Sequence, residues 1–199
     1  MKKFLAALLT AAALISSPAC IASADYYEPR EAILAYDVYA FLVSVINPQT
    51  PPQEAIGYAE RIGLLTIDYT ARYRRETGKM FDLHEPMTRQ EFAIATKKTL
   101  DILKKFGVEY VLTDKPKGGR ISKFFKDGKE IRKHALDDVE FAVNAGILKL
   151  YALENGYFTM PEKPITLEEI SDFINAVNLS GNLRLSSYTL SQFQKFSAQ

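Results

Sequence analysis

A helix-start signature that occurs twice constrains this chain more than any other feature. Residues 85–92 read Glu-Pro-Met-Thr-Arg-Gln-Glu-Phe, and residues 163–170 read Lys-Pro-Ile-Thr-Leu-Glu-Glu-Ile. In each copy a Thr is followed three residues later by a Glu, which is the pattern of a capping box at a helix N-terminus. Two complete start signals of the same kind indicate two copies of one building unit.

The residues of this signature have defined roles at the start of a helix. Thr88 and Thr166 are expected to act as N-caps, and Glu91 and Glu169 to accept a hydrogen bond from the N–H of each cap. Apolar residues stand before each cap and four residues after it, where they can close a hydrophobic staple. They are Met87 and Phe92 in the first copy and Ile165 and Ile170 in the second. Both helix starts are therefore predicted from local chemistry alone.

The segments upstream of the two signatures repeat as well. An apolar helical pattern ends at Gly63 before the first signature and at Gly146 before the second, where a left-handed C-cap residue is favoured. Pro86 and Pro164 are 78 residues apart (164 − 86), whereas the two glycines are 83 apart (146 − 63). Each unit thus reads as a helix, a Gly, a loop, a Pro and a capped helix, and the units differ mainly in their loops.

This order of elements resembles the S-layer homology (SLH) repeat of bacterial surface proteins, over roughly residues 54–106 and 125–178. The resemblance implies an all-α fold of helix-loop-helix units packed as a small bundle, with irregular loops and little or no strand. SLH domains usually have three repeats in a pseudo-threefold spindle. They attach exported proteins non-covalently to cell-wall polysaccharide or peptidoglycan-linked polymers. Only two repeats are recognisable here, so the spindle is either incomplete or completed by a second copy of this chain.

The resemblance also implies a binding site. In the family a Thr-Arg-x-Glu motif lies in the binding grooves and its Arg contacts an anionic glycan, and this motif matches Thr88, Arg89 and Glu91. The second unit keeps Thr166 and Glu169 but has Leu at position 167, so its groove is expected to be weakened or purely structural.

Two groups of Arg residues have both a functional and a structural interpretation. Arg89 falls at the first helical position, where free N–H groups and the helix dipole favour a carboxylate or phosphate; alternatively it is merely solvated. Arg72 and Arg74 lie in a loop expected over residues 64–78. That loop is either a solvated surface segment or an anion-contacting lip beside the Thr88 helix.

The N-terminus carries an export signal. A basic start at Lys2 and Lys3 leads into an apolar run, and small residues up to Ala24 suit cleavage there. Cys20 suggests lipidation as the alternative, although Ser17 stands where a lipoprotein site favours Leu. Beyond the signal peptide no apolar run is long enough to span a membrane. The protein is therefore expected at the cell wall, at the cell surface or in the periplasm.

Composition and motifs argue against several functions. Removing the two signal lysines leaves 23 basic against 24 acidic residues, a balance unlike that of a nucleic-acid binder. His84 and His134 have no partner at metal-ligand spacing, and no nucleophile elbow or phosphate-binding loop occurs. We therefore expect no catalytic residue, no metal and no cofactor.

The chain is expected to divide into six segments. These are a signal peptide at 1–24, an N-terminal helix or half repeat at 25–50, an SLH-like repeat at 51–107, a linker at 108–124, a second repeat at 125–180 and a C-terminal segment at 181–199. Pairing Glu31 with Glu91 would make the first helix part of a truncated third repeat. Further helices are expected at about 53–62, 88–106, 131–145 and 166–177.

Three functions follow from these observations. The first is an exported, non-catalytic module that binds an anionic wall glycan and anchors at the cell surface. The alternative is a secreted or periplasmic helical protein–protein interaction module that has lost glycan binding. The third is an enzyme whose site is assembled from residues that the sequence does not connect.

Overall fold

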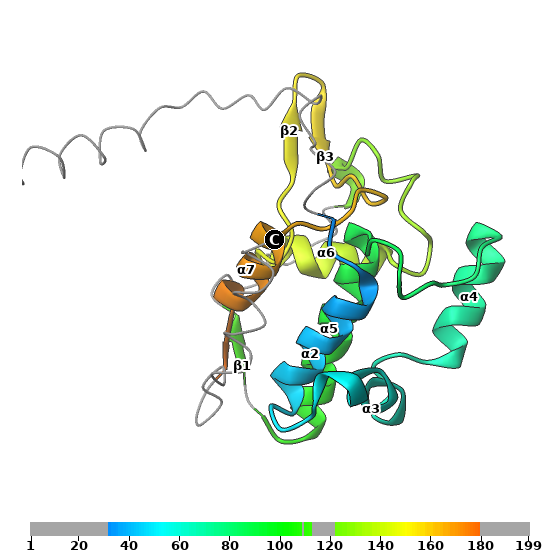
Figure 1. Ribbon diagram of the computed structural model, residues 1–199. Helices are drawn as coiled ribbons and strands as arrows, with labels where there is room; N and C mark the ends of the chain where they lie inside the picture. The colour runs from blue at the N-terminus through cyan, green and yellow to red at the C-terminus, as the bar shows by residue number, and fades with distance from the viewer. Residues whose placement is uncertain (1–31, 109, 113–121, 180–199) are drawn as a thin grey trace, which may run out of the picture.

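The computed structural model of the chain describes residues 32–108, 110–112 and 122–179, and these are mostly helical (Figure 1). The expected signal peptide, Cys20 and the C-terminal segment 181–199 lie outside the described residues. The described helices are α2 (Ala35–Ile46), α3 (Ala55–Arg61), α4 (Ile67–Thr77), α5 (Arg89–Lys105), α6 (Leu136–Asn144) and α7 (Leu167–Ala176). Short 3₁₀ turns occupy Pro52–Glu54 and Ser122–Phe124.

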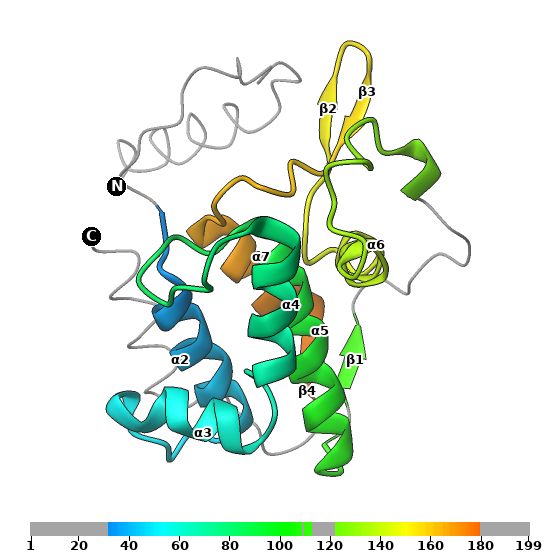
Figure 2. The same ribbon diagram turned by 90° about the vertical axis from the view of Figure 1, so that its right-hand side faces the viewer.

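Four strands of three residues each form two small antiparallel pairs. Strand β1 (Tyr110–Leu112) pairs with β4 (Val177–Leu179), and β2 (Tyr151–Leu153) pairs with β3 (Gly156–Phe158) as a hairpin. The two turn residues are Glu154 and Asn155, and Gly156 begins β3 directly after them. In both Figure 1 and Figure 2 this hairpin projects from the helical body. The prediction of a mainly helical chain is confirmed, with slightly more strand than expected.

Both helix-start predictions are confirmed. Thr88 is the N-cap of α5, and the Glu91 carboxylate accepts a hydrogen bond from its N–H at 2.8 Å. Thr166 is the N-cap of α7, where Glu169 accepts from the Thr166 N–H at 3.1 Å and donates its own N–H to the Thr166 hydroxyl at 3.4 Å. The four staple residues all have an exposed fraction of 0%: Met87, Phe92, Ile165 and Ile170. Each capped entrance is therefore held by polar bonds on one side and apolar burial on the other.

The segments entering α2, α5 and α7 lie side by side. The Met87 N–H donates to Ile33 O at 3.0 Å, and the Ile165 N–H donates to Met87 O at 2.9 Å. Antiparallel bridges pair Leu34 with Pro86 and Thr88 with Pro164. In both cases the N-cap of one helix pairs with the Pro that precedes the next helix start. The segment entering α2 is therefore a third, quasi-equivalent copy of the segments entering α5 and α7.

The register of this third entrance differs from the one expected. Pairing Glu31 with Glu91 assumes an offset of 60 residues (91 − 31), whereas the N-caps Leu34 and Thr88 are 54 apart (88 − 34). The difference arises because α2 begins at a Leu whose side chain makes no cap hydrogen bond. Without a Thr, the sequence carries no local marker of where this helix starts.

Residues 64–78 were expected to be a loop or a helical turn, and they contain the full helix α4. Thr66 caps it by accepting from the Tyr69 N–H at 3.2 Å, and Gly78 ends it at φ 72°. Only Tyr69 of this helix is buried, so α4 lacks the apolar stripe by which amphipathic helices are normally found. The helix expected at 131–145 also begins later, at Leu136.

Aromatic side chains from α2, α5 and α7 meet in the core. The ring of Phe173 lies edge-on to Phe41 and to Phe92, with both pairs of centroids 6.2 Å apart. Edge-to-face packing at this distance adds to the free energy gained by burying the rings. The core therefore lies directly beneath the three adjoining helix entrances.

A half-buried carboxyl group on α6 should make stability depend on pH. Burial raises the pKa of Asp138 to about 6, with Lys97 lowering it and Asp101 and Asp137 raising it. Between about pH 4 and 6 the folded state keeps a proton that the unfolded chain releases, so the free energy of unfolding falls as pH rises through this range. Above pH 6 the full cost of holding the charged Asp138 carboxylate in the folded state is present.

We expect Asp138→Asn to raise the free energy of unfolding at pH 7 by about 1 kcal/mol, discounted for partial solvent screening, and to flatten its dependence on pH between about 4 and 6. Urea unfolding at pH 4.5 and pH 7 measures both effects. Asp137→Asn, an exposed change in the same helical turn, is the control for the helix dipole. Lower stability of Asp138→Asn at pH 7 would contradict the assignment.

Candidate functional site

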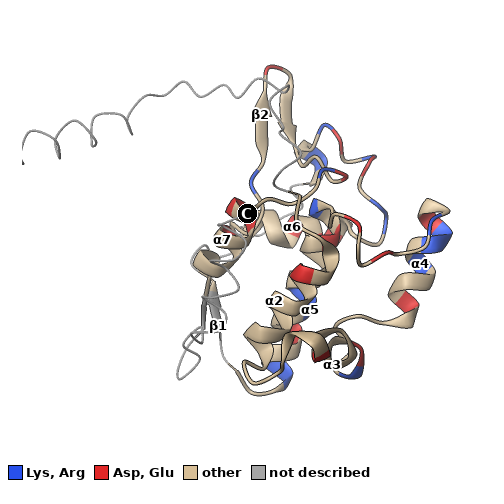
Figure 3. Ribbon diagram, in the orientation of Figure 1, with Lys and Arg blue, Asp and Glu red and all other residues tan. Residues whose placement is uncertain are grey.

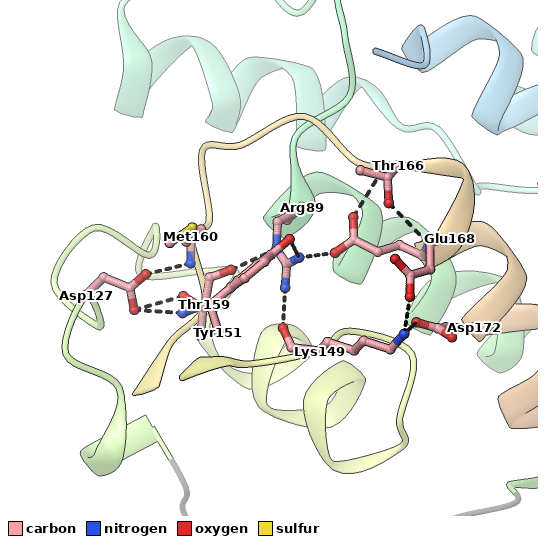
Figure 4. A network of polar contacts seen from close by, with 10 residues as sticks. Arg89, Asp127, Lys149, Tyr151, Thr159, Met160, Thr166, Glu168 and Asp172 are labelled. Carbon is pink, nitrogen blue, oxygen red and sulfur yellow. Dashed lines mark hydrogen bonds and ion pairs between the residues drawn. The ribbon is translucent and has the colours of Figure 1, made fainter. Parts of the chain in front are cut away.

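Arg89, the residue expected to contact an anionic ligand, is buried where the two units meet and bonds to several groups of the second unit. Its side chain begins at the first residue of α5, and its exposed fraction is 1%. Nε donates to Thr159 O at 2.8 Å, and Nη1 donates to the Tyr151 hydroxyl at 3.1 Å. Nη1 also pairs with the Glu169 carboxylate, and Nη2 donates to Lys149 O (Figure 4). All three guanidinium nitrogens therefore have partners within the chain.

Glu169 serves two helices at once. Its carboxylate closes the capping box of α7 and pairs with the first residue of α5. Burial raises the pKa of Glu169, although Arg89 and the Thr166 N–H both lower it. Because desolvation is the largest contribution, this carboxylate would be poorly tolerated here without its partners. The first and second units are thus joined by an ion pair whose members are 80 residues apart.

The loop around this pair is itself organised by polar bonds. The Asp127 carboxylate accepts from the Thr159 N–H at 3.0 Å, from the Thr159 hydroxyl at 3.1 Å and from the Met160 N–H at 2.6 Å. These bonds position the Thr159 carbonyl that accepts from Arg89 (Figure 4). Sequence reasoning missed Asp127 and Thr159; a single Asp in an irregular stretch gives no signal of such a role.

A second junction, at the start of α5, is built from the same residue types: an Arg, a capping-box Glu and a Tyr. Arg132 Nη2 donates to Glu91 at 2.8 Å and lies 3.6 Å from Glu162. The Arg132 guanidinium carbon is 4.7 Å from the centre of the Tyr73 ring, as that of Arg89 is from Tyr151. Each capping-box Glu therefore pairs with an Arg that stacks on a Tyr.

The predicted site residues fall into two groups. Thr88, Arg89, Glu91, Thr166 and Glu169 all lie at the helix entrances, where the two Glu and Arg89 are buried.

Arg72 and Arg74 instead occupy exposed positions on α4, which lies on the opposite side of the molecule from α7 in Figure 1. Figure 3 shows α4 carrying a cluster of basic residues. Arg89 could reach a ligand only if Glu169 or Tyr151 moved away. The structure does not bring the two groups together.

No group of three or more His, Cys, Asp or Glu side chains in the described part of the chain could hold a metal ion. Within the same ranges, every helix is too short or too polar to cross a bilayer. Compared with known proteins, the chain matches no family model, no curated protein and no solved structure.

The energetics of the Arg89 junction can be tested by mutation. Arg89→Met leaves the Glu169 carboxylate buried without its cationic partner, so it should lower the free energy of unfolding by about 3–5 kcal/mol. Adding Glu169→Gln removes the stranded charge while keeping a cap acceptor, and should recover part of the loss. Chemical denaturation of the four members of this double-mutant cycle measures the coupling. Strictly additive effects would show that the pair contributes no specific stabilisation.

Proposed function

We propose that this protein is an exported, non-catalytic SLH-like module that binds an anionic cell-wall glycan. The proposal rests first on the twice-repeated Thr-x-x-Glu signature, which resembles the SLH repeat. Three adjoining helix entrances support it as well. In this proposal the glycan anchors the protein at the cell surface through charge and polar contacts.

The observation that carries the proposal is the group of exposed basic residues on and just after α4. Three arginines of this helix and the lysine after it are all exposed: Arg72, Arg74, Arg75 and Lys79. Cations grouped on one helix raise the positive potential around its exposed side, which attracts a polyanion.

The entrance residues have a different part in this proposal. Arg89, Glu91 and Glu169 are buried and paired, so they hold the units in register. The ligand-contacting charges are then Arg72 and Arg74 rather than the motif Arg.

A protein–protein interaction module is the second candidate, favoured by the projecting β2–β3 hairpin. Tyr151, Leu153 and Tyr157 are exposed there, with Tyr157 at 54%. Exposed apolar side chains on a projecting element are a common feature of docking surfaces.

Retention on purified cell-wall sacculi tests the proposed function. Wild type should sediment with sacculi at low salt and be released as salt screens the charges. The double variant Arg72→Ala, Arg74→Ala should reduce the bound fraction several-fold, because two cations of the contact surface are lost.

Lys104→Ala with Lys105→Ala is the matched control, since both lysines are exposed near the end of α5 and the loss of charge is the same. This variant should bind like wild type. Wild-type protein that stays in the supernatant at low salt, or equal losses for both double variants, would exclude the α4 surface as the glycan contact.

A further inference from the structure

The projecting β2–β3 hairpin has one covered edge and one open edge. On the outer side of β3, Tyr157 forms a parallel bridge with Phe125, and the Lys126 N–H donates to Tyr157 O at 2.9 Å. In Figure 2, β3 accordingly lies between β2 and the segment around Ser122–Phe124. Strand β2 pairs with β3 alone among the described residues. The outer edge of β2 is therefore open in this part of the chain.

The register of the hairpin determines which backbone groups point out of this edge. Ala152 lies opposite Tyr157. Opposed residues of an antiparallel pair either exchange both hydrogen bonds or point both N–H and C=O away from each other. The Tyr157 carbonyl points outward, since it accepts from the Lys126 N–H. The Ala152–Tyr157 pair is thus of the second kind, and the N–H and C=O of Ala152 point out of the open edge of β2.

Nothing in the sequence of β2 protects its edge from pairing with another strand. All three residues of the strand are exposed, with Tyr151 at 36% and Leu153 at 39%. Edge strands are commonly protected by a Lys, a Pro, a bulge or a covering segment. The strand Tyr-Ala-Leu contains neither a charged residue nor a Pro. An exposed apolar edge of this kind is a template for a further strand.

The edge of β2 is complementary to a second copy of itself. If two copies pair antiparallel about a two-fold axis at Ala152, the two alanines face each other and exchange both hydrogen bonds. Tyr151 then lies opposite Leu153 of the second copy, which is a favourable aromatic–aliphatic cross-strand pair. Glu154 falls opposite Leu150 of the second copy, so the two acidic turns lie at opposite ends of the pairing. A parallel pairing would instead bring the two Glu154 side chains together.

We propose that two copies of this chain associate through antiparallel pairing of β2 with β2, with the two-fold axis at Ala152. The two hairpins would join into one continuous sheet, in the order β3–β2–β2–β3. Because each hairpin projects from its helical body, the two bodies stay apart (Figures 1 and 2). The contact is small, so the dimer is weak and forms at high local concentration. It does not depend on glycan binding, whose proposed contacts Arg72 and Arg74 lie on α4.

Sedimentation velocity of the full chain between about 10 µM and about 1 mM tests the dimer. The average mass should rise from monomer towards dimer over this range. Ala152→Pro removes the outward N–H at a position where an edge strand tolerates Pro, so it should weaken the dimer at least about tenfold while the hairpin stays folded. Ala152→Val is the matched control, because it has nearly the size of Pro and keeps the N–H. It should dimerise at least as well as wild type.

A second variant does not depend on the effect of Pro on folding. Leu153→Lys places a charge opposite Tyr151 of the second copy and should also weaken the dimer. Met80→Lys is its control, since Met80 is another exposed apolar residue, at 70%, and lies outside the hairpin. This control should dimerise like wild type.

Amide hydrogen exchange locates the contact. The Ala152 amide should exchange more slowly as the protein concentration rises, because the pairing covers it. Wild type that stays monomeric up to about 1 mM would overturn the proposal. So would a dimer in which the Ala152 amide exchanges as fast as in the monomer, or in which Leu153→Lys has no effect.

Discussion

The burial of one positive charge, that of Arg89, determines how the two repeats fit together. A guanidinium with 1% exposure is tolerable only when its donors are all used, and its partners come from three separate places. Because Glu169 is among them, the start of α7 cannot shift relative to the start of α5 without stranding both charges. The interaction therefore specifies the register between units more than it contributes net stability.

The three helix entrances share a backbone arrangement but not their side chains. A backbone hydrogen bond joins Met87 to Ile33, and another joins Ile165 to Met87, so each pair of neighbouring entrances is linked by the same contact. The residue three positions after the N-cap is acidic in all three helices: Asp37, Glu91 and Glu169. Burial raises the pKa of Asp37 and of Glu169 alike. Acidic residues near a helix N-terminus suit the dipole, which accounts for the charge at this position even in α2, where the cap residue is Leu34.

Features encoded by neighbouring residues were predictable, and features made by distant ones were not. The caps at Thr88 and Thr166 and the left-handed glycines Gly63 and Gly146 need only a few adjacent residues, and all four were found from sequence. The sequence did not predict α4, which has too few apolar residues to show an apolar stripe, and it did not predict the pairing of Arg89 with Glu169.

At the sequence level Arg89 was placed correctly at the first position of a helix. The N–H groups expected to be free there are not, because those of Arg89 and Gln90 donate to Lys163 O and Pro161 O. The partner of Arg89 was not predicted, because the anion that pairs with it is the Glu169 side chain, 80 residues away, rather than a ligand. A motif read within one helix cannot show whether another part of the same chain already occupies it.

The geometry explains why only one of the three helix starts has an arginine at its first position that pairs with the acidic residue of the next helix. Arg89, at the first position of α5, pairs with the acidic residue of the next helix, α7. The equivalent first position of α2 is Ala35, which cannot reach Glu91, and there Arg132 from the segment before α6 takes the place of that arginine. Leu167 fills the third such position and packs against the core instead. The complete copy is interior, so the guanidinium of Arg89 is closed to solvent, whereas Arg72 and Arg74 of α4 are exposed.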